Sequence, residues 1–151
     1  MVTARFLQNY LHERIPISKS MGVEVLEATV NGVKLVAPLS PNINHRETVF
    51  GGSASAVAIL SAWSYLYLRL KNENINSRIV IQRNTMHYEH PITDTFTASS
   101  VVCDPLIWSK FIATLKRKNR ARVKISSILH CNGRKVGEFE GYFVAMDSRT
   151  A

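Results

Sequence analysis

The sequence predicts an α+β protein in which a long antiparallel sheet wraps around one central apolar helix. Residues 50–68 carry no charge and have a helical pattern that is apolar on nearly every face. Segments with alternating polar and apolar residues lie on both sides of this stretch and read as six strands. A sheet with one apolar face needs a cover, and a single apolar helix fits that face.

The length and the amino-acid composition are those of an ordinary globular protein. A chain of 151 residues fits one domain, 1–151, and is long enough to bury a core. Hydrophobic residues make up 46% of the chain and charged residues 20%, as is typical of a soluble protein. Two cysteines are too few for a disulfide framework, so both are expected to be free thiols. The N-terminal residues lack the apolar segment of a secretory signal, and we expect a cytoplasmic protein.

The first third of the chain predicts one helix and two strands. Residues 3–14 have an amphipathic helical period, which Pro16 ends. Residues 22–30 and 33–40 follow as two strands. We expect a hairpin turn at Asn31-Gly32, because this dipeptide between strand-forming segments is a strong hairpin signal.

The central helix is placed at about residues 50–70, after a loop at 41–49. Its uncharged span is long enough to cross a bilayer, so its length alone allows either a membrane helix or a buried core helix. The glycines and serines inside the span, and the amphipathic strands around it, favour the core helix. We therefore expect no membrane partner.

The second half of the chain predicts four more strands, with residues 106–118 helical in part because Ile107, Phe111 and Leu115 repeat every four positions. Asn132-Gly133 indicates a second hairpin turn between the last two strands. The four strands are expected at residues 79–90, 95–103, 121–131 and 136–146.

Three motifs in this order resemble those of hotdog-fold acyl-thioester enzymes. The first is Asn44, followed six residues later by Phe50-Gly51-Gly52 and the long helix. The second is the strand end at residues 87–94, and the third is the closing hairpin around Asn132-Gly133. Within this superfamily the chain looks most like the thioesterase group that is also found fused to acetyltransferase domains. The motifs together span most of residues 20–146.

The resemblance implies the hotdog fold, in which a long antiparallel sheet wraps around the central helix. It implies at least a homodimer, with a tetramer as an alternative, because family members bind the acyl thioester between the helix of one chain and the sheet of the other. The implied substrate is a thioester of coenzyme A or acyl carrier protein, in fatty acid metabolism, and no cofactor is expected. The residues expected to contact the substrate include Phe50, Ser61, Trp63 and Tyr88.

Gly51 and Gly52 are the strongest candidates for chemistry. Cleavage of a thioester requires stabilisation of negative charge on its carbonyl oxygen, and free N–H groups at a helix N-terminus provide it. Glycines allow the substrate to approach because they lack side chains. The alternative is that both glycines only allow the helix to pack against a strand.

The usual acid of many hotdog thioesterases is missing from the helix. The resemblance places an Asp or Glu nine residues after Phe50, where this chain has Ile59. A base would then have to come from the loop, where His45 and Glu47 are candidates. Asn44 is a candidate to orient water or to donate its amide to the thioester oxygen. The alternative for all three is an ordinary loop role.

Three functions remain open at this point. The first is hydrolysis of an acyl thioester. The second is decarboxylation of a malonyl-acyl-carrier-protein, which needs no base and could use the same donors. The third is binding of an acyl thioester without catalysis, which Ile59 makes reasonable.

The net charge of +8 indicates an acidic partner. A basic cluster that includes Lys116, Arg117, Lys118 and Arg120 suits the phosphates of coenzyme A or an acidic carrier protein, although charge can also simply protect a strand edge. Nucleic acid is a weaker hypothesis, because few aromatic residues lie near this charge. The histidines show no metal-ligand spacing, and we expect no metal.

Overall fold

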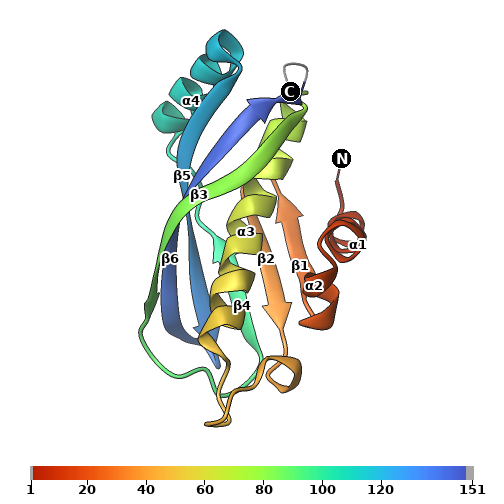
Figure 1. Cartoon of the computed structure of the whole chain (residues 1–151), viewed down its shortest axis with the longest axis vertical. Coiled ribbons are helices and arrows are strands. Elements are labelled where there is room, and N and C mark those ends of the chain that lie inside the picture. The colour runs from red at the N-terminus through yellow and green to blue at the C-terminus, as the bar shows by residue number, and fades with distance from the viewer. Residues whose placement is uncertain (1, 149–151) are drawn as a thin grey trace.

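The uncharged stretch forms helix α3, Gly51–Asn72, at the centre of the fold (Figure 1). The computed structural model describes residues 2–148, so the predicted domain 1–151 extends slightly beyond it at both ends. Leu66 and Leu70 of α3 are almost fully buried, and Arg69 and Lys71 occupy its last turn, where the helix dipole favours positive charge. Among the described residues, no helix combines the length and apolarity needed to span a membrane. The prediction of a buried core helix is confirmed.

Six antiparallel strands curve around α3 in the order β1-β2-β4-β5-β6-β3. The predicted α+β fold, an antiparallel sheet around one helix, is therefore confirmed. The strands are β1 (Glu24–Thr29), β2 (Gly32–Ala37), β3 (Ser77–Tyr88), β4 (Phe96–Ser100), β5 (Arg120–Cys131) and β6 (Arg134–Asp147). Helices α1 (Ala4–Arg14), α2 (Pro16–Ser20) and α4 (Pro105–Lys118), and the 3-10 helix η1 (Ser40–Asn42), complete the chain.

Alternation along β5 and β6 produces the apolar face that α3 covers. Val123, Ile125, Ser127 and Leu129 of β5 are buried, while the residues that alternate with them, Lys124, Ser126 and Ile128, are more exposed. Phe139 and Phe143 of β6 extend the same face and are completely buried. A period of two therefore places one set of side chains in the core and the other on the convex face of the sheet.

Buried hydroxyl groups fix α3 on this apolar face. Ser127 of β5 donates a hydrogen bond to the carbonyl oxygen of Ala58 at 3.0 Å, and Ser61 of α3 donates to the carbonyl oxygen of Val33 at 3.1 Å. Both serines are fully buried. The pairings satisfy polar groups that would otherwise be costly inside the core, and they set the position of the helix along the sheet.

The structure corrects several predicted details. Pro16 ends α1 but also begins α2, which suits proline because the first helical N–H has no partner. The first hairpin turns at Val30-Asn31, with Gly32 already paired to Thr29. Gly32 lacks a positive φ, whereas Asn132 and Gly133 have φ values of 51° and 76° and form the expected left-handed turn.

Helix α4 is fully helical, where only a partial helix was predicted. Asp104 caps it by accepting hydrogen bonds from the N–H groups of Leu106 and Ile107, and Asn119 ends it with a φ of 60°. Strand β4 is shorter than predicted and leaves Cys103 in a loop, whereas Cys131 is the last residue of β5. Both cysteines are buried free thiols.

Candidate active site

The N-terminus of α3 leaves two backbone donors free. Phe50 is the residue before the helix, and its carbonyl oxygen accepts from the N–H groups of Ser53 and Ala54 at 2.9 and 3.1 Å. The N–H groups of Gly51 and Gly52 donate to no acceptor within residues 2–148. Two adjacent donors at the positive end of a 22-residue helix can bind an oxygen that carries partial negative charge.

Aromatic rings border the two glycines. The Tyr88 hydroxyl donates to the carbonyl oxygen of Gly51 at 3.1 Å, so the end of β3 lies against the start of α3. A Cβ at Gly51 would make ordinary contact with the Tyr88 ring, 3.5 Å away. A Cβ at Gly52 would overlap the Phe50 ring, while Gly52 itself is exposed. The structure thus brings together four predicted residues: Phe50, Gly51, Gly52 and Tyr88.

Asn42 anchors the chain just before these glycines, and the sequence analysis missed it. Its side chain is 2% exposed and donates to the carbonyl oxygens of Met21 and Pro38 at 2.9 and 2.8 Å. Its own carbonyl oxygen accepts from the N–H of Phe50 at 2.7 Å. Asn42 therefore fixes where α3 begins. No local pattern marks it, because the contact with Met21 is formed only by folding.

The Asn44 side chain organises its own loop. Its Oδ1 accepts from the N–H groups of Arg46 and Thr48 at 2.8 and 3.2 Å, and its Nδ2 donates to Thr48 Oγ1 at 2.9 Å. This is the turn geometry expected of an Asn side chain that bonds to nearby backbone. Asn44 is half-buried, and its amide is used within the loop. Its role as a donor to substrate stays a prediction.

His45 and Glu47 lie exposed in the same loop. Glu47 has a φ of 63°, a left-handed conformation that is uncommon for a residue with a side chain. Its N–H donates to the carbonyl oxygen of Asn44 at 3.2 Å, which holds this turn. Strained loop conformations are often found near functional sites. The roles of His45 and Glu47 as bases stay predictions.

A second loop lies beside the first one. The N–H of Val49 donates to the carbonyl oxygen of Ile92 at 2.8 Å, and this bond joins the two loops next to the α3 N-terminus. After Tyr88, the N–H groups of Glu89 and His90 donate to the carbonyl oxygen of Val136 at 2.9 and 3.2 Å. Tyr88 is therefore held at the edge of the candidate site by backbone contacts on both sides.

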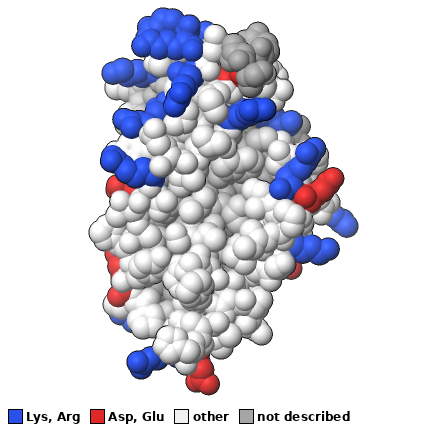
Figure 2. All heavy atoms as spheres, in the orientation of Figure 1, with Lys and Arg blue, Asp and Glu red and all other residues white. Residues whose placement is uncertain are grey.

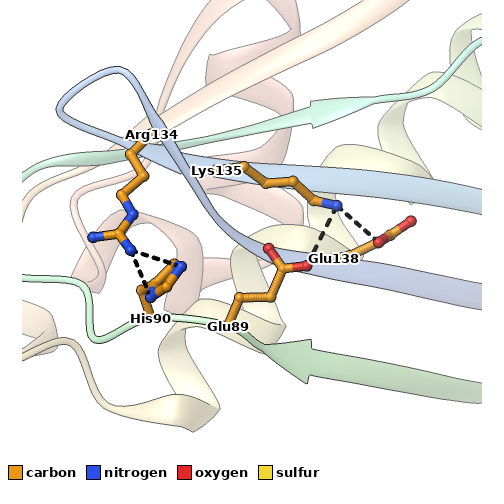
Figure 3. Close-up of polar contacts among 5 residues, drawn as sticks. All are labelled: Glu89, His90, Arg134, Lys135 and Glu138. Atoms are coloured by element: carbon orange, nitrogen blue, oxygen red, sulfur yellow. Dashed lines mark hydrogen bonds and ion pairs between the residues drawn. The ribbon is translucent and has the colours of Figure 1, made fainter.

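Side chains at this strand end pair with the β5–β6 hairpin (Figure 3). Arg134 donates to the imidazole of His90, with its Nη2 3.0 Å from Nδ1 and 2.9 Å from Nε2. Lys135 lies 3.0 Å from Glu138 and 3.4 Å from Glu89. Hydrogen bonding to Lys135 lowers the pKa of Glu138, and the same contact raises the pKa of Lys135. Glu89 and His90 are thus engaged in surface pairs that hold the strand end.

Ser61 and Trp63 lie further along α3. Ser61 is ten residues from Gly51, about 15 Å at the helical rise, and is buried against β2. Trp63 donates its indole N–H to the carbonyl oxygen of Ile79 at 3.2 Å and stacks on Tyr67, with ring centroids 5.2 Å apart. Ile59 is half-buried on α3. Ser61 and Trp63 are not close to the glycines, and their roles in substrate binding stay predictions.

The predicted basic residues lie at the opposite end of α3. Figure 2 shows Lys and Arg side chains gathered over the end of the molecule that carries α4. Lys116, Arg117 and Lys118 form the last turn of α4, and Arg120 begins β5. Helix α3 rises roughly 33 Å over its 22 residues, so this cluster and the glycines are far apart within one chain.

The arrangement supports stabilisation of an oxyanion at the start of α3, bordered by Phe50 and Tyr88 and held by two loops. In the part of the chain that the structure describes, no three His, Cys, Asp or Glu side chains lie close enough together to hold a metal ion. The chemistry available from the geometry is therefore backbone hydrogen bonding at a helix N-terminus, with loop carboxylate and imidazole groups nearby in sequence.

Comparison with known proteins adds the family. The sequence profile of the family described as putative thioesterase (yiiD_Cterm) matches residues 4–147. The crystal structure of a putative thioesterase from Shewanella oneidensis is similar, with 28% sequence identity and a TM-score of 0.84 over 95% of this chain and 96% of that one. A protein of unknown function from Chlorobaculum tepidum TLS has 26% identity and a TM-score of 0.91, covering 96% of this chain and 94% of that one.

A more distant thioesterase structure, from Haemophilus influenzae, shares the fold. Its sequence identity is 10% and its TM-score is 0.77, over 97% of this chain and 92% of that one. Together with the order of helix and strands, these neighbours identify the architecture as the hotdog fold that the motifs at Asn44 and Phe50-Gly51-Gly52 predicted.

Proposed function

We propose that this chain, which belongs to the family described as putative thioesterase, hydrolyses an acyl thioester of coenzyme A or acyl carrier protein. One observation carries the proposal: the adjacent N–H groups of Gly51 and Gly52 are free, at the N-terminus of the central helix. In the proposed reaction they bind the thioester carbonyl oxygen as it becomes negative. The thiol of the carrier is the leaving group, and the acyl group leaves as a carboxylic acid.

Water must be activated or at least positioned for hydrolysis. Glu47 and His45 are the proposed bases, because both side chains are exposed in the loop that leads into α3. Asn44 supports this loop through its contacts with Arg46 and Thr48. Replacing Glu47 or His45 by Gln removes the base and keeps a polar side chain of similar size. A loss of about 10²-fold in kcat is expected for the true base.

Decarboxylation of a malonyl thioester is the second candidate. Ile59 favours it, since the helix offers an apolar side chain where the resemblance places a carboxylate. This reaction breaks the bond to the carboxylate, releases carbon dioxide and leaves an enolate, whose oxygen the same two N–H groups would stabilise. The enolate carbon then takes a proton from water to give the acetyl thioester. The reaction needs no base, so Glu47→Gln would leave the rate unchanged.

A panel of acyl thioesters on coenzyme A and on acyl carrier protein tests the proposal. Release of free thiol supports hydrolysis, whereas release of carbon dioxide with an acetyl thioester supports decarboxylation. Asn44→Asp keeps the acceptor oxygen that orders the loop but removes the amide donor together with its bond to Thr48. Thr48→Val is the control, because it removes that bond and keeps the Asn44 amide. If Asn44 donates to the oxyanion, Asn44→Asp loses about 10²-fold in kcat. Unchanged turnover would assign Asn44 to loop structure alone, and no turnover of any thioester by the wild type would contradict the proposed function.

We further propose that the chain assembles as a homodimer, or as a tetramer built from dimers. Strand β3 is an edge of the sheet, and most of its residues are exposed, including Val80 at 48%. Figure 2 shows a broad face with few charges over α3 and β3. An exposed edge strand beside an uncharged face is suited to pairing with a second copy. Light scattering in solution tests this, and a monomer mass at micromolar concentration would contradict it.

A further inference from the structure

The convex face of the sheet carries a hollow that the proposed chemistry does not use. We name it the α4–β5 hollow; its volume is about 560 Å³. The hollow is shallow and open to solvent, so it offers a surface site for one end of a ligand and not an enclosed pocket. It lies between the last turns of α4 and the outer faces of β5, β6 and β3. Its lining consists of Gln82, Thr114, Lys118, Arg120, Ala121, Arg122 and Val144.

The charge in this hollow has one sign. Lys118, Arg120 and Arg122 contribute three cations, and no acidic side chain lines it. Across residues 2–148, neither Lys118 nor Arg120 takes part in an ion pair. Three cations gathered in a concave site attract compact anions more strongly than the same charges spread over a flat surface. The unpaired cations are available to a ligand.

Arg122 is held in position before any ligand arrives. Its Nη1 donates to Oε1 of Gln82 at 3.2 Å, and its guanidinium carbon lies 5.0 Å from the ring centroid of Tyr142. Arg83 lies over the same ring at 5.4 Å. A guanidinium fixed in this way loses less conformational freedom when it binds an anion, and its planar fork matches the oxygens of a phosphate.

The same contacts argue against a long nucleic acid as the occupant. Proteins that bind single strands stack bases on exposed aromatic rings beside their cations. Tyr142 is the aromatic ring next to this charge, and two guanidinium groups already contact it. The size of the hollow and its cations fit one nucleotide-sized ligand with two or more phosphate groups.

We propose that the α4–β5 hollow is a phosphate-binding site for a nucleotide-sized ligand, with Lys118, Arg120 and Arg122 as its anion-binding residues. The nucleotide end of a coenzyme A thioester bound at the glycines of a second copy is one source of such phosphates, because the hollow and the glycines of one chain lie at opposite ends of α3. That identification rests on the proposed function and on the proposed dimer. A separate nucleotide is another source. The phosphate site itself depends only on the geometry of the hollow.

Binding of adenosine 3′,5′-bisphosphate to the full chain tests the site by calorimetry. We expect saturable binding that weakens as salt is added, because the attraction is electrostatic. Arg120→Gln and Lys118→Gln should each weaken it by about tenfold, the size expected when one charged hydrogen-bond donor is lost. Lys19→Gln on α2 removes the same charge from an exposed position elsewhere and should leave binding unchanged.

Kinetics separate the two sources of phosphate. If coenzyme A supplies it, Arg120→Gln raises the ratio of KM for an acyl-coenzyme A to KM for the same acyl group on N-acetylcysteamine, which has no phosphate. If the bisphosphate binding is lost and this ratio stays constant, the site serves a separate nucleotide. The proposal is overturned if the wild type fails to bind the bisphosphate or if all three variants bind it equally. It is also overturned if the protein binds only an acidic carrier protein or RNA. Turnover of the N-acetylcysteamine thioester reports the proposed function independently of these outcomes.

Discussion

A methyl group added at Gly51 or at Gly52 tests the geometry of the start of α3, which is also the proposed oxyanion site. Ala in place of Gly stabilises a helix by up to about 1 kcal/mol. At Gly51 the new Cβ would meet the Tyr88 ring at 3.5 Å, which is ordinary contact. Gly51→Ala should therefore raise the free energy of unfolding by roughly 0.5–1 kcal/mol.

The same change at Gly52 should give no such gain. The Cβ would overlap the Phe50 ring and lie 3.0 Å from two further ring atoms, Cδ2 and Cζ. The exposed ring can move, but leaving its rotamer costs about 0.5–1.5 kcal/mol. This cost cancels the helical gain, so Gly52→Ala should have nearly wild-type stability. The two variants should differ by about 1 kcal/mol, or roughly 0.5 M in the midpoint of urea unfolding at constant slope.

A double-mutant cycle with Phe50→Ala isolates the contact. In the Phe50→Ala background the overlap is absent, and Gly52→Ala should then stabilise by about as much as Gly51→Ala does, up to about 1 kcal/mol. If Gly52→Ala stabilises equally with and without the Phe50 ring, the geometry given for this helix start is refuted. Thioester turnover adds a second readout. Gly52→Ala should lower kcat/KM by less than the roughly 10²-fold that loss of an oxyanion donor costs, because both N–H groups remain and only the space beside them is reduced.

Other variants test the rest of the structure. Ser127→Ala should lower the free energy of unfolding by about 1 kcal/mol in urea titrations, since it removes the buried hydrogen bond to Ala58. Gly133→Ala should cost about 1–2 kcal/mol because its φ is 76°, whereas Gly32→Ala, without a positive φ, should be nearly neutral; equal thermal shifts would contradict the turn assignments. Burial raises the pKa of the Cys103 thiol, so stability should fall as pH rises above about 8.5, where only the unfolded thiol ionises. Cys103→Ala should remove that part of the pH dependence.

The parts of the fold that were predictable are those with a strong local period. The uncharged run that became α3 and the alternation of Val123, Ile125 and Leu129 in β5 both follow from burial of one face. The second hairpin was predictable because Asn132-Gly133 supplies both positive φ values. The turn at Val30-Asn31 was not, since pairing with neighbouring strands set its register against the dipeptide signal.

The candidate site was predictable only at its centre. Gly51 and Gly52 stand out because a Gly-Gly pair before an apolar helix is a local pattern with a physical meaning. The Asn44 contacts are also local, but sequence alone did not decide between a turn and a substrate donor. Asn42 was missed because its partners Met21 and Pro38 come together only in the folded chain.

The position of the two free donors is therefore set by tertiary contacts outside the helix. The Phe50 N–H is held by the Asn42 carbonyl oxygen, and the Gly51 carbonyl oxygen is held by the Tyr88 hydroxyl. These bonds fix the backbone on either side of the Gly51 N–H while leaving that N–H open. Preorganised donors stabilise charge without reorganising during the reaction. Hydrolysis and decarboxylation would use this feature equally, so the loop side chains Glu47 and His45, and not the helix, should decide which reaction the site performs.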